Sequence, residues 1–208
     1  TNHEYMGLSF WLAVPLSILV MGILGYLFNW GVLRHMFGQS QTSIVILTIA
    51  MGFIIRFIAG AIWSHEPTSL ETPFAGQDIR SGGLVLGIDE VLIVVVTAIL
   101  TLAFYIFFSR TRIGLAMQAA SQNQLAAYYM GIPVRRIHSL VWGLSGMVAA
   151  VAGILFASKG AIDPSTGLLG IKAFAAAAIG GFGSLPGALL GGLIIGLVEP
   201  LASRYGPP

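Results

Sequence analysis

The chain has 208 residues, of which 56% are hydrophobic and only 9% are charged, and its mean hydropathy is +0.88. Soluble domains carry about 25% charged residues, so this composition excludes an ordinary soluble protein and indicates an integral membrane protein. The net charge of +2 is too small to indicate nucleic-acid binding, and the absence of cysteine excludes disulfides, thiolate chemistry and cysteine metal sites.

Long apolar runs divide the chain into predicted membrane spans. About 20 apolar residues cross the ~30 Å hydrocarbon core as an α-helix, and Trp11 and Trp30 lie near the ends of the first run, as interfacial aromatics do. We predict an all-α, polytopic helical membrane protein with about five full spans plus a short half-helix. The predicted spans are residues 6–28, 43–63, 90–108, 138–158 and 188–202.

The chain begins with Thr and ends just after an apolar run. We therefore expect residues 1–208 to be a single transmembrane domain that is a fragment of a longer protein. Between the second and third spans, the segment LVLGI that follows Gly82 and Gly83 is predicted to include a short strand.

A polar stretch, residues 110–137, interrupts the apolar pattern between the third and fourth spans. It has two arginines at each end and no acidic residue. Apolar residues recur at helical spacing between these ends, which predicts one short helix that Gly131 ends as a C′ residue and Pro133 stops. From the residues alone, a docking element for another protein and an ordinary ordered loop both remain open.

The loop charges predict the orientation of the chain. If the spans alternate in direction, residues 29–42 and 110–137 lie on one side, and this side holds five arginines and no acid. The acidic loop residues lie on the other side. By the positive-inside rule, residues 110–137 face the cytoplasm.

The last part of the chain is rich in glycine. Residues 172–186 are predicted to form a short or re-entrant half-helix, because about a dozen residues cannot cross a bilayer. The pairs Gly187/Gly191 and Gly192/Gly196 have the small-xxx-small spacing of close helix packing. The residues assigned to the break and to packing are Gly180, Gly181, Gly183, Pro186, Gly187 and Gly191.

The stretch GGFGSLPG does not match a nucleotide-binding motif. It lacks the Lys-Ser/Thr of a P-loop and the third glycine of a dinucleotide fingerprint. No nucleophile, base or metal set stands out elsewhere, so we expect no enzyme activity and no bound cofactor.

Two charges lie within predicted spans. Arg56 is near the middle of the second span, where it either lines a transport path or snorkels from a shifted span whose other edge Trp63 marks. Glu199, late in the final span, is expected to form a structural ion pair near the outer interface.

Two stretches together resemble a known family. They are TRIGLAMQAASQNQLAAYYMGIPVRRI and, downstream, GAIDPSTGLLGIKAFAAAAIGGFGSLPGALLGGLIIGLVE. In order and spacing they are similar to bacterial branched-chain amino acid ABC transporter permeases of the LivH/LivM type. By this resemblance the chain lacks an N-terminal segment and a last span.

The resemblance implies a function and partners. The chain would be a permease subunit of an ATP-driven importer in the bacterial cytoplasmic membrane. It would work with a second permease subunit, identical or different, two cytoplasmic ATPase subunits and an extracytoplasmic substrate-binding protein. The element that docks on the ATPases would be residues 116–131. Its coupling residues would be Ala116, Ala120, Asn123, Ala127 and Gly131.

Other functions remain open at this point. Related permeases carry urea, short amides or sugars in place of branched-chain amino acids. The rival class is an ATP-independent carrier or channel, in which Arg56 and Glu199 would serve ion or proton coupling.

Overall fold

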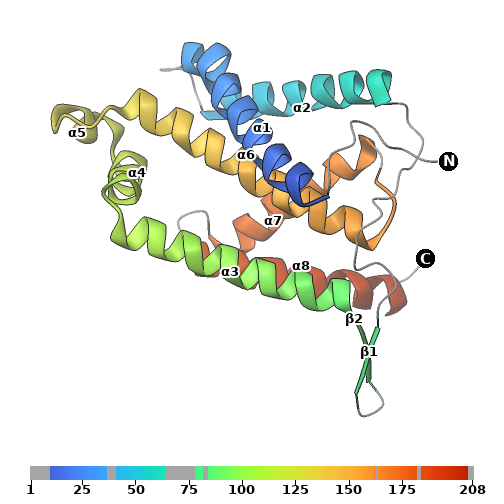
Figure 1. Cartoon of the computed structure of the whole chain (residues 1–208). Helices are drawn as coiled ribbons and strands as arrows, with labels where there is room; N and C mark the ends of the chain where they lie inside the picture. The colour runs from blue at the N-terminus through green and yellow to red at the C-terminus, as the bar shows by residue number, and fades with distance from the viewer. Residues whose placement is uncertain are drawn as a thin grey trace. The chain divides into compact units, whose positions relative to one another are not determined.

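A computed structural model of the chain describes residues 10–36, 41–63, 78–81, 84–162, 164–181 and 184–205. Nearly all of these residues are helical, which confirms the all-α prediction (Figure 1). They belong to two compact units, one of residues 1–50 and 67–162 and the other of residues 51–66 and 163–208.

Within the described residues, five helices are long and apolar enough to cross a membrane, as predicted. They are α1 (Phe10–Gly31), α2 (Gln41–Trp63), α3 (Ile88–Arg110), α6 (Val134–Lys159) and α8 (Leu185–Tyr205). Residues 6–9 of the first predicted span lie outside the described residues. The last span was predicted too short, because α8 has 21 residues and begins earlier than residue 188.

The expected strand is present in the first unit. It is β2 (Leu84–Gly87), which pairs antiparallel with β1 (Asp78–Ser81) and leads directly into α3. The strand prediction for LVLGI is therefore confirmed.

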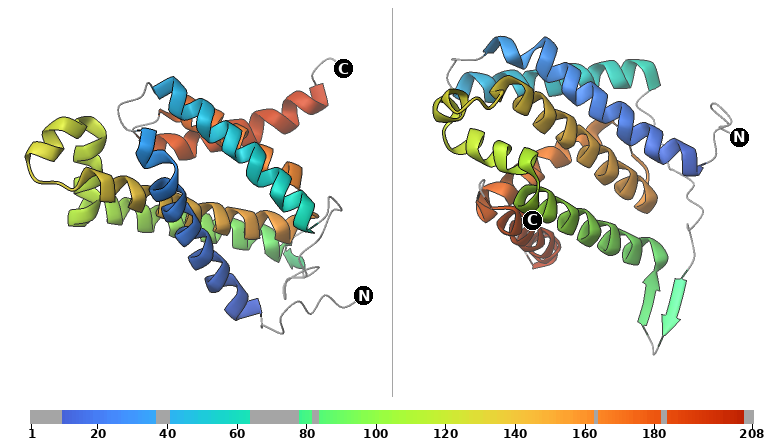
Figure 2. Two further views of the ribbon diagram at one scale, coloured as in Figure 1. Left: turned by 90° about the horizontal axis from the view of Figure 1, so that it is seen from above. Right: turned by 60° about the vertical axis from the view of Figure 1, so that its left-hand side comes forward.

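Helices α1 and α6 of the first unit cross in close contact, as the views in Figure 2 show. A Cβ atom built on Gly25 would lie 2.3 Å from the carbonyl oxygen of Trp142. A Cβ atom built on Gly146 would lie 2.3 Å from the carbonyl oxygen of Met21. Only glycine at these two positions lets the helix backbones approach so closely.

Polar contacts join α6 to its neighbours near both of its ends. Near its start, Asn29 Nδ2 of α1 donates a buried 2.8 Å hydrogen bond to Ser139 Oγ. At its end, Lys159 Nζ forms a 2.8 Å ion pair with Glu90 Oε1, at the start of α3. Helices α3 and α6 therefore run antiparallel, and the polar stretch that joins them leaves from the opposite end of the pair.

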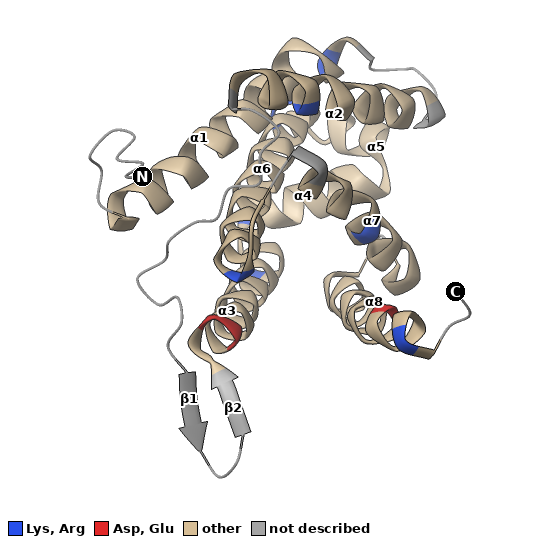
Figure 3. Cartoon of the chain, turned by 90° about the vertical axis from the view of Figure 1, so that its right-hand side faces the viewer, with Lys and Arg blue, Asp and Glu red and all other residues tan. Residues whose placement is uncertain are grey.

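The second unit contains a helical hairpin formed by α7 (Leu169–Gly180) and α8, after the short η2 (Pro164–Leu168). Helix α7 has 12 residues, which is about 18 Å and too short for a bilayer core. Figure 3 shows how few charged residues these helices carry.

The predicted half-helix ends earlier than residue 186. Helix α7 ends at Gly181, whose backbone has φ +88°. A residue with a side chain would be strained in this conformation, so glycine suits the position. Ser184 Oγ then accepts a hydrogen bond from the backbone N–H of Gly187 at 3.1 Å, as a helix N-cap does. Pro186 consequently lies in the first turn of α8, where its missing N–H has no intrahelical partner to lose.

Candidate functional site

The polar stretch folds as two short helices, α4 (Arg112–Gln122) and α5 (Gln124–Tyr129), and we call residues 111–133 the α4–α5 segment. It begins at Thr111, whose hydroxyl donates to the Phe107 carbonyl at 2.7 Å and accepts from the Gly114 N–H at 2.9 Å. A Cβ atom on Gly114 would lie 2.3 Å from the Phe107 oxygen. The end of α3 and the start of α4 thus form one tight corner.

The prediction of a single short helix is wrong, because the helix breaks at Asn123. The Asn123 backbone is extended, and its N–H bonds the Ala119 carbonyl at 3.1 Å to close α4. Its side-chain oxygen accepts from the Ala126 N–H at 3.0 Å and caps α5. Asparagine is among the favoured N-cap residues, so one residue ends one helix and starts the next.

The prediction that Gly131 is the C′ residue at the end of the helical stretch is confirmed, and the helix it ends is α5. Gly131 has φ +81°, its N–H bonds the Tyr128 carbonyl at 3.0 Å, and the N–H of Ile132 bonds the Ala127 carbonyl at 3.0 Å. This pair of bonds is the Schellman motif. Pro133 follows as the residue before α6, also as predicted.

The α4–α5 segment has a hydrophobic core that it shares with α6. Met117, Ala120 and Ala127 are only 3–5% exposed and cluster with Val134 and Ile137 of α6. The partly buried residues packed against this cluster include two from the end of α3, Phe107 and Phe108. The segment is therefore a packed unit attached to the ends of both spans.

The other face of α5 and its C-cap residue Met130 carry large apolar side chains that are mostly exposed, and the rings of Tyr128 and Tyr129 contact each other edge to face. Leu125, Tyr128, Tyr129 and Met130 are 63%, 67%, 77% and 82% exposed. Unlike the exposed leucines of the spans, these side chains belong to a stretch too polar for lipid. A contiguous exposed apolar patch of this kind marks an interaction surface, and tyrosine and methionine are enriched in protein interfaces.

The structure places the five predicted coupling residues in the α4–α5 segment, in two different roles. Ala120 and Ala127 are buried, and Ala116 is packed against the same core. Asn123 and Gly131 are exposed and set the backbone path. The exposed residues of α5 were not predicted, although the run Tyr-Tyr-Met before a C′ glycine in a polar stretch was a signal for them.

In the α7–α8 hairpin, three of the predicted glycines form the helix contact. A Cβ atom on Gly180 or Gly187 would lie 1.9 Å from the carbonyl oxygen of the other, and one on Gly191 would lie 2.0 Å from the Ala176 oxygen. Gly181 forms the turn, and Gly183 lies outside the described residues. The second small-residue pair, Gly192 and Gly196, faces open space on the other side of α8.

The ion pair expected for Glu199 is present. Its partner is Lys172 of α7, and both side chains are about half exposed. Because the pair joins the start of α7 to the far part of α8, it closes the open end of the hairpin, opposite the Gly180–Gly187 contact.

Arg56 lies in α2, in the thirteen residues of that helix that belong to the second unit. It is partly buried, and no described acidic residue forms an ion pair with it. By helix rise it lies about 9 Å from Ile62, where the apolar span ends. Within the described residues, no group of three His, Asp or Glu side chains is arranged to hold a metal ion.

The family model and the individual relatives that match this chain all point to one family of transport permeases. The family model described as branched-chain amino acid transport system / permease component matches residues 3–207. The chain is 33% identical to the high-affinity branched-chain amino acid transport system permease protein BraD of Pseudomonas aeruginosa. That match covers 90% of the chain and 63% of BraD.

Two further relatives are LivH proteins. The LivH permease of Escherichia coli K12 is 31% identical over 94% of the chain and 67% of its own length. A probable LivH permease of Methanocaldococcus jannaschii is 31% identical over 99% of the chain and 67% of its own length. The chain thus spans about two thirds of the length of these relatives, and no solved structure gives a significant match.

Proposed function

Because the chain belongs to the family of branched-chain amino acid transport permeases, we propose that it is the membrane-spanning subunit of an ATP-driven importer for branched-chain or similar amino acids. The two compact units together form one permease domain in the cytoplasmic membrane. A second permease subunit completes the path, an extracytoplasmic protein delivers the substrate, and two cytoplasmic ATPase subunits supply the energy.

The observation that carries this proposal is the exposed apolar face of α5. In a multi-pass membrane protein, apolar side chains on a polar segment have neither lipid nor a core to contact. Tyr128, Tyr129 and Met130 are suited to a hydrophobic groove on a soluble partner. We identify this partner as the ATPase. The two arginines at each end of residues 110–137 and the lack of acid there favour a partner surface with an acidic rim.

The way the segment is built supports a role in energy coupling. Force applied to α5 reaches α3 through the corner at Thr111 and reaches α6 through the shared core and the Schellman turn. Closure of the ATPases would therefore move both spans together, as rigid-body switching requires. A flexible loop of the same length would absorb that movement.

Arg56 is proposed to line the transport path. A charge at this depth in a span costs a few kcal/mol unless polar groups or water surround it. No described acidic residue pairs with it, and a water-filled path would supply the missing polar surroundings.

The experiment that tests the docking proposal uses the full-length protein with its native partners. Tyr128→Ala with Tyr129→Ala removes the centre of the patch without touching the buried core or the caps. The matched control is Tyr205→Ala, because Tyr205 is 78% exposed against 77% for Tyr129 but lies at the end of α8. Copurified ATPase and amino acid uptake are measured for each variant.

We expect the double variant to lose bound ATPase by at least about 30-fold, since even one interface hot-spot residue contributes about 2 kcal/mol or more. Uptake should fall with it, whereas the control should behave as the wild type. Full ATPase recovery and normal uptake in the double variant would remove the docking proposal. Uptake driven by an ion gradient with no ATPase present would favour the carrier class.

A further inference from the structure

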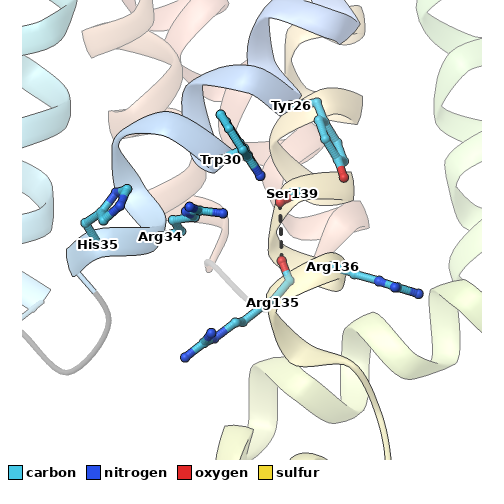
Figure 4. A pocket seen from close by; sticks show the side chains of 7 residues that line it. All are labelled: Tyr26, Trp30, Arg34, His35, Arg135, Arg136 and Ser139. Carbon is cyan, nitrogen blue, oxygen red and sulfur yellow. Dashed lines mark hydrogen bonds between the residues drawn. The ribbon is translucent and has the colours of Figure 1, made fainter.

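A second feature of the first unit lies apart from the exposed face of α5. It is a hollow of about 530 Å³ between the end of α1 and the start of α6, a size within the about 300–1,000 Å³ of small-molecule sites. Figure 4 shows its basic lining residues, Arg34 and His35 of η1 (Leu33–Met36) and Arg135 and Arg136 of α6. All four side chains are exposed.

The two chain segments that line this hollow contain no acidic residue to balance its positive charge. There is no Asp or Glu between Glu4 and Glu66 or between Glu90 and Asp163, so both segments that line the hollow are free of acid. Arg135 and Arg136 also occupy the first turn of α6, where the positive end of the helix dipole disfavours cations. No side chain caps that helix end. Arginines in such a place are stabilised when an external anion binds between them.

The floor and the wall of the hollow are held in place. The buried hydrogen bond from Asn29 to Ser139 fixes the two helices at its floor. The Arg34 guanidinium carbon lies 4.6 Å from the centre of the Trp30 ring, a cation–π contact that orients this side chain. In Figure 4, Arg34 and Arg135 extend on one side of Ser139 and Arg136 on the other.

We propose that this hollow binds the phosphate group of an anionic phospholipid, with Arg34 and Arg135 as its main ligands and Arg136 on its flank. Guanidinium groups match phosphate oxygens by paired, charge-assisted hydrogen bonds. Basic hollows between spans on the side favoured by arginine are suited to anionic headgroups.

The position of the hollow favours a lipid over a protein. It lies where two apolar spans end, and the half-exposed Trp30 on its wall is a residue type that concentrates at the membrane interface. Tyr26, one turn earlier on α1, also lines it and offers an apolar ring surface to the start of an acyl chain. The surface suited to a protein partner is the exposed apolar patch of α5, which lies apart from this hollow.

The test measures lipid binding to the purified full-length protein, without ATPase, so its outcome is independent of the docking proposal. Native mass spectrometry gives the apparent dissociation constant of phosphatidylglycerol, with zwitterionic phosphatidylcholine and inorganic phosphate as separate arms. The test variant is Arg34→Gln with Arg135→Gln. The matched control is Arg110→Gln with Arg112→Gln, which removes the same charge at the α3–α4 corner, outside the hollow.

We expect phosphatidylglycerol to bind the wild type more tightly than phosphatidylcholine. The test variant should weaken this binding roughly 25-fold, about fivefold for each arginine, and the control should weaken it much less. Equal weakening by both variants would mean general surface attraction and would overturn the proposal. Inorganic phosphate that binds with the same dependence on Arg34 and Arg135, and displaces the lipid at equal concentration, would assign the hollow to a soluble phosphate and would also overturn it.

Discussion

Replacing single glycines of α6 with alanine tests the close crossing of α1 and α6. In Gly146→Ala the new methyl group would lie 2.3 Å from the Met21 carbonyl oxygen, whereas in Gly153→Ala it would meet nothing within 4 Å. Both changes raise helix propensity by about 1 kcal/mol. Because this gain is common to both variants, the difference between their free energies of unfolding isolates the contact with α1.

We expect that difference to be about 1–3 kcal/mol, the usual range for an extra methyl group in a filled interior. The upper part of the range applies here, since the clashing atom belongs to a helix backbone and cannot rotate away. Gly146→Ala should therefore be less stable than the wild type, and Gly153→Ala should be more stable.

The assay is equilibrium unfolding of the full-length protein in mixed micelles with a rising fraction of sodium dodecyl sulfate, followed by circular dichroism. Adding Gly25→Ala to Gly146→Ala should cost less than the sum of the two single changes, because helices already moved apart accommodate the second methyl group. Equal stabilities of Gly146→Ala and Gly153→Ala would refute the close crossing.

Two further predictions concern the charged residues of the second unit. Lys172→Glu should lower the yield of folded protein, because it leaves two like charges at the open end of the α7–α8 hairpin. Adding Glu199→Lys should restore most of that yield. A double variant that restores nothing would mean that the ion pair does not stabilise the hairpin. If the charge of Arg56 lines the path, Arg56→Gln should reduce amino acid uptake several-fold while the amount of protein in the membrane stays the same. Arg56→Lys should retain part of the uptake. Normal uptake in Arg56→Gln would favour snorkelling of Arg56 to the interface.

The features predicted well from the sequence are those decided by local chemistry. The spans follow from runs of about 20 apolar residues, which have no stable alternative to a helix in lipid. The end of α5 follows from Gly131, because only glycine adopts the left-handed conformation there without strain, and from Pro133 two residues later. The strand at Leu84–Gly87 follows from β-prone residues after a glycine pair.

The features missed depend on contacts between distant segments. Alanine is compatible with both a buried and an exposed position, so nothing local reveals that Ala120 and Ala127 point into a core with α6. Asn123 was missed as a break because the helical spacing continues across it, and its capping role depends on the angle at which α5 leaves α4. The glycines of the α1–α6 crossing were also missed, since each is recognisable only beside the partner helix.

The break at Asn123 gives the α4–α5 segment a property that a single helix would lack. One straight helix between α3 and α6 would present the same face to the core and to a partner along its whole length. Two helices joined at a capped corner let α4 bury its apolar side against the spans while α5 turns Tyr128 and Tyr129 outward. The buried alanines pack the segment tightly against the spans, and the exposed tyrosines leave one face accessible to the proposed ATPase partner.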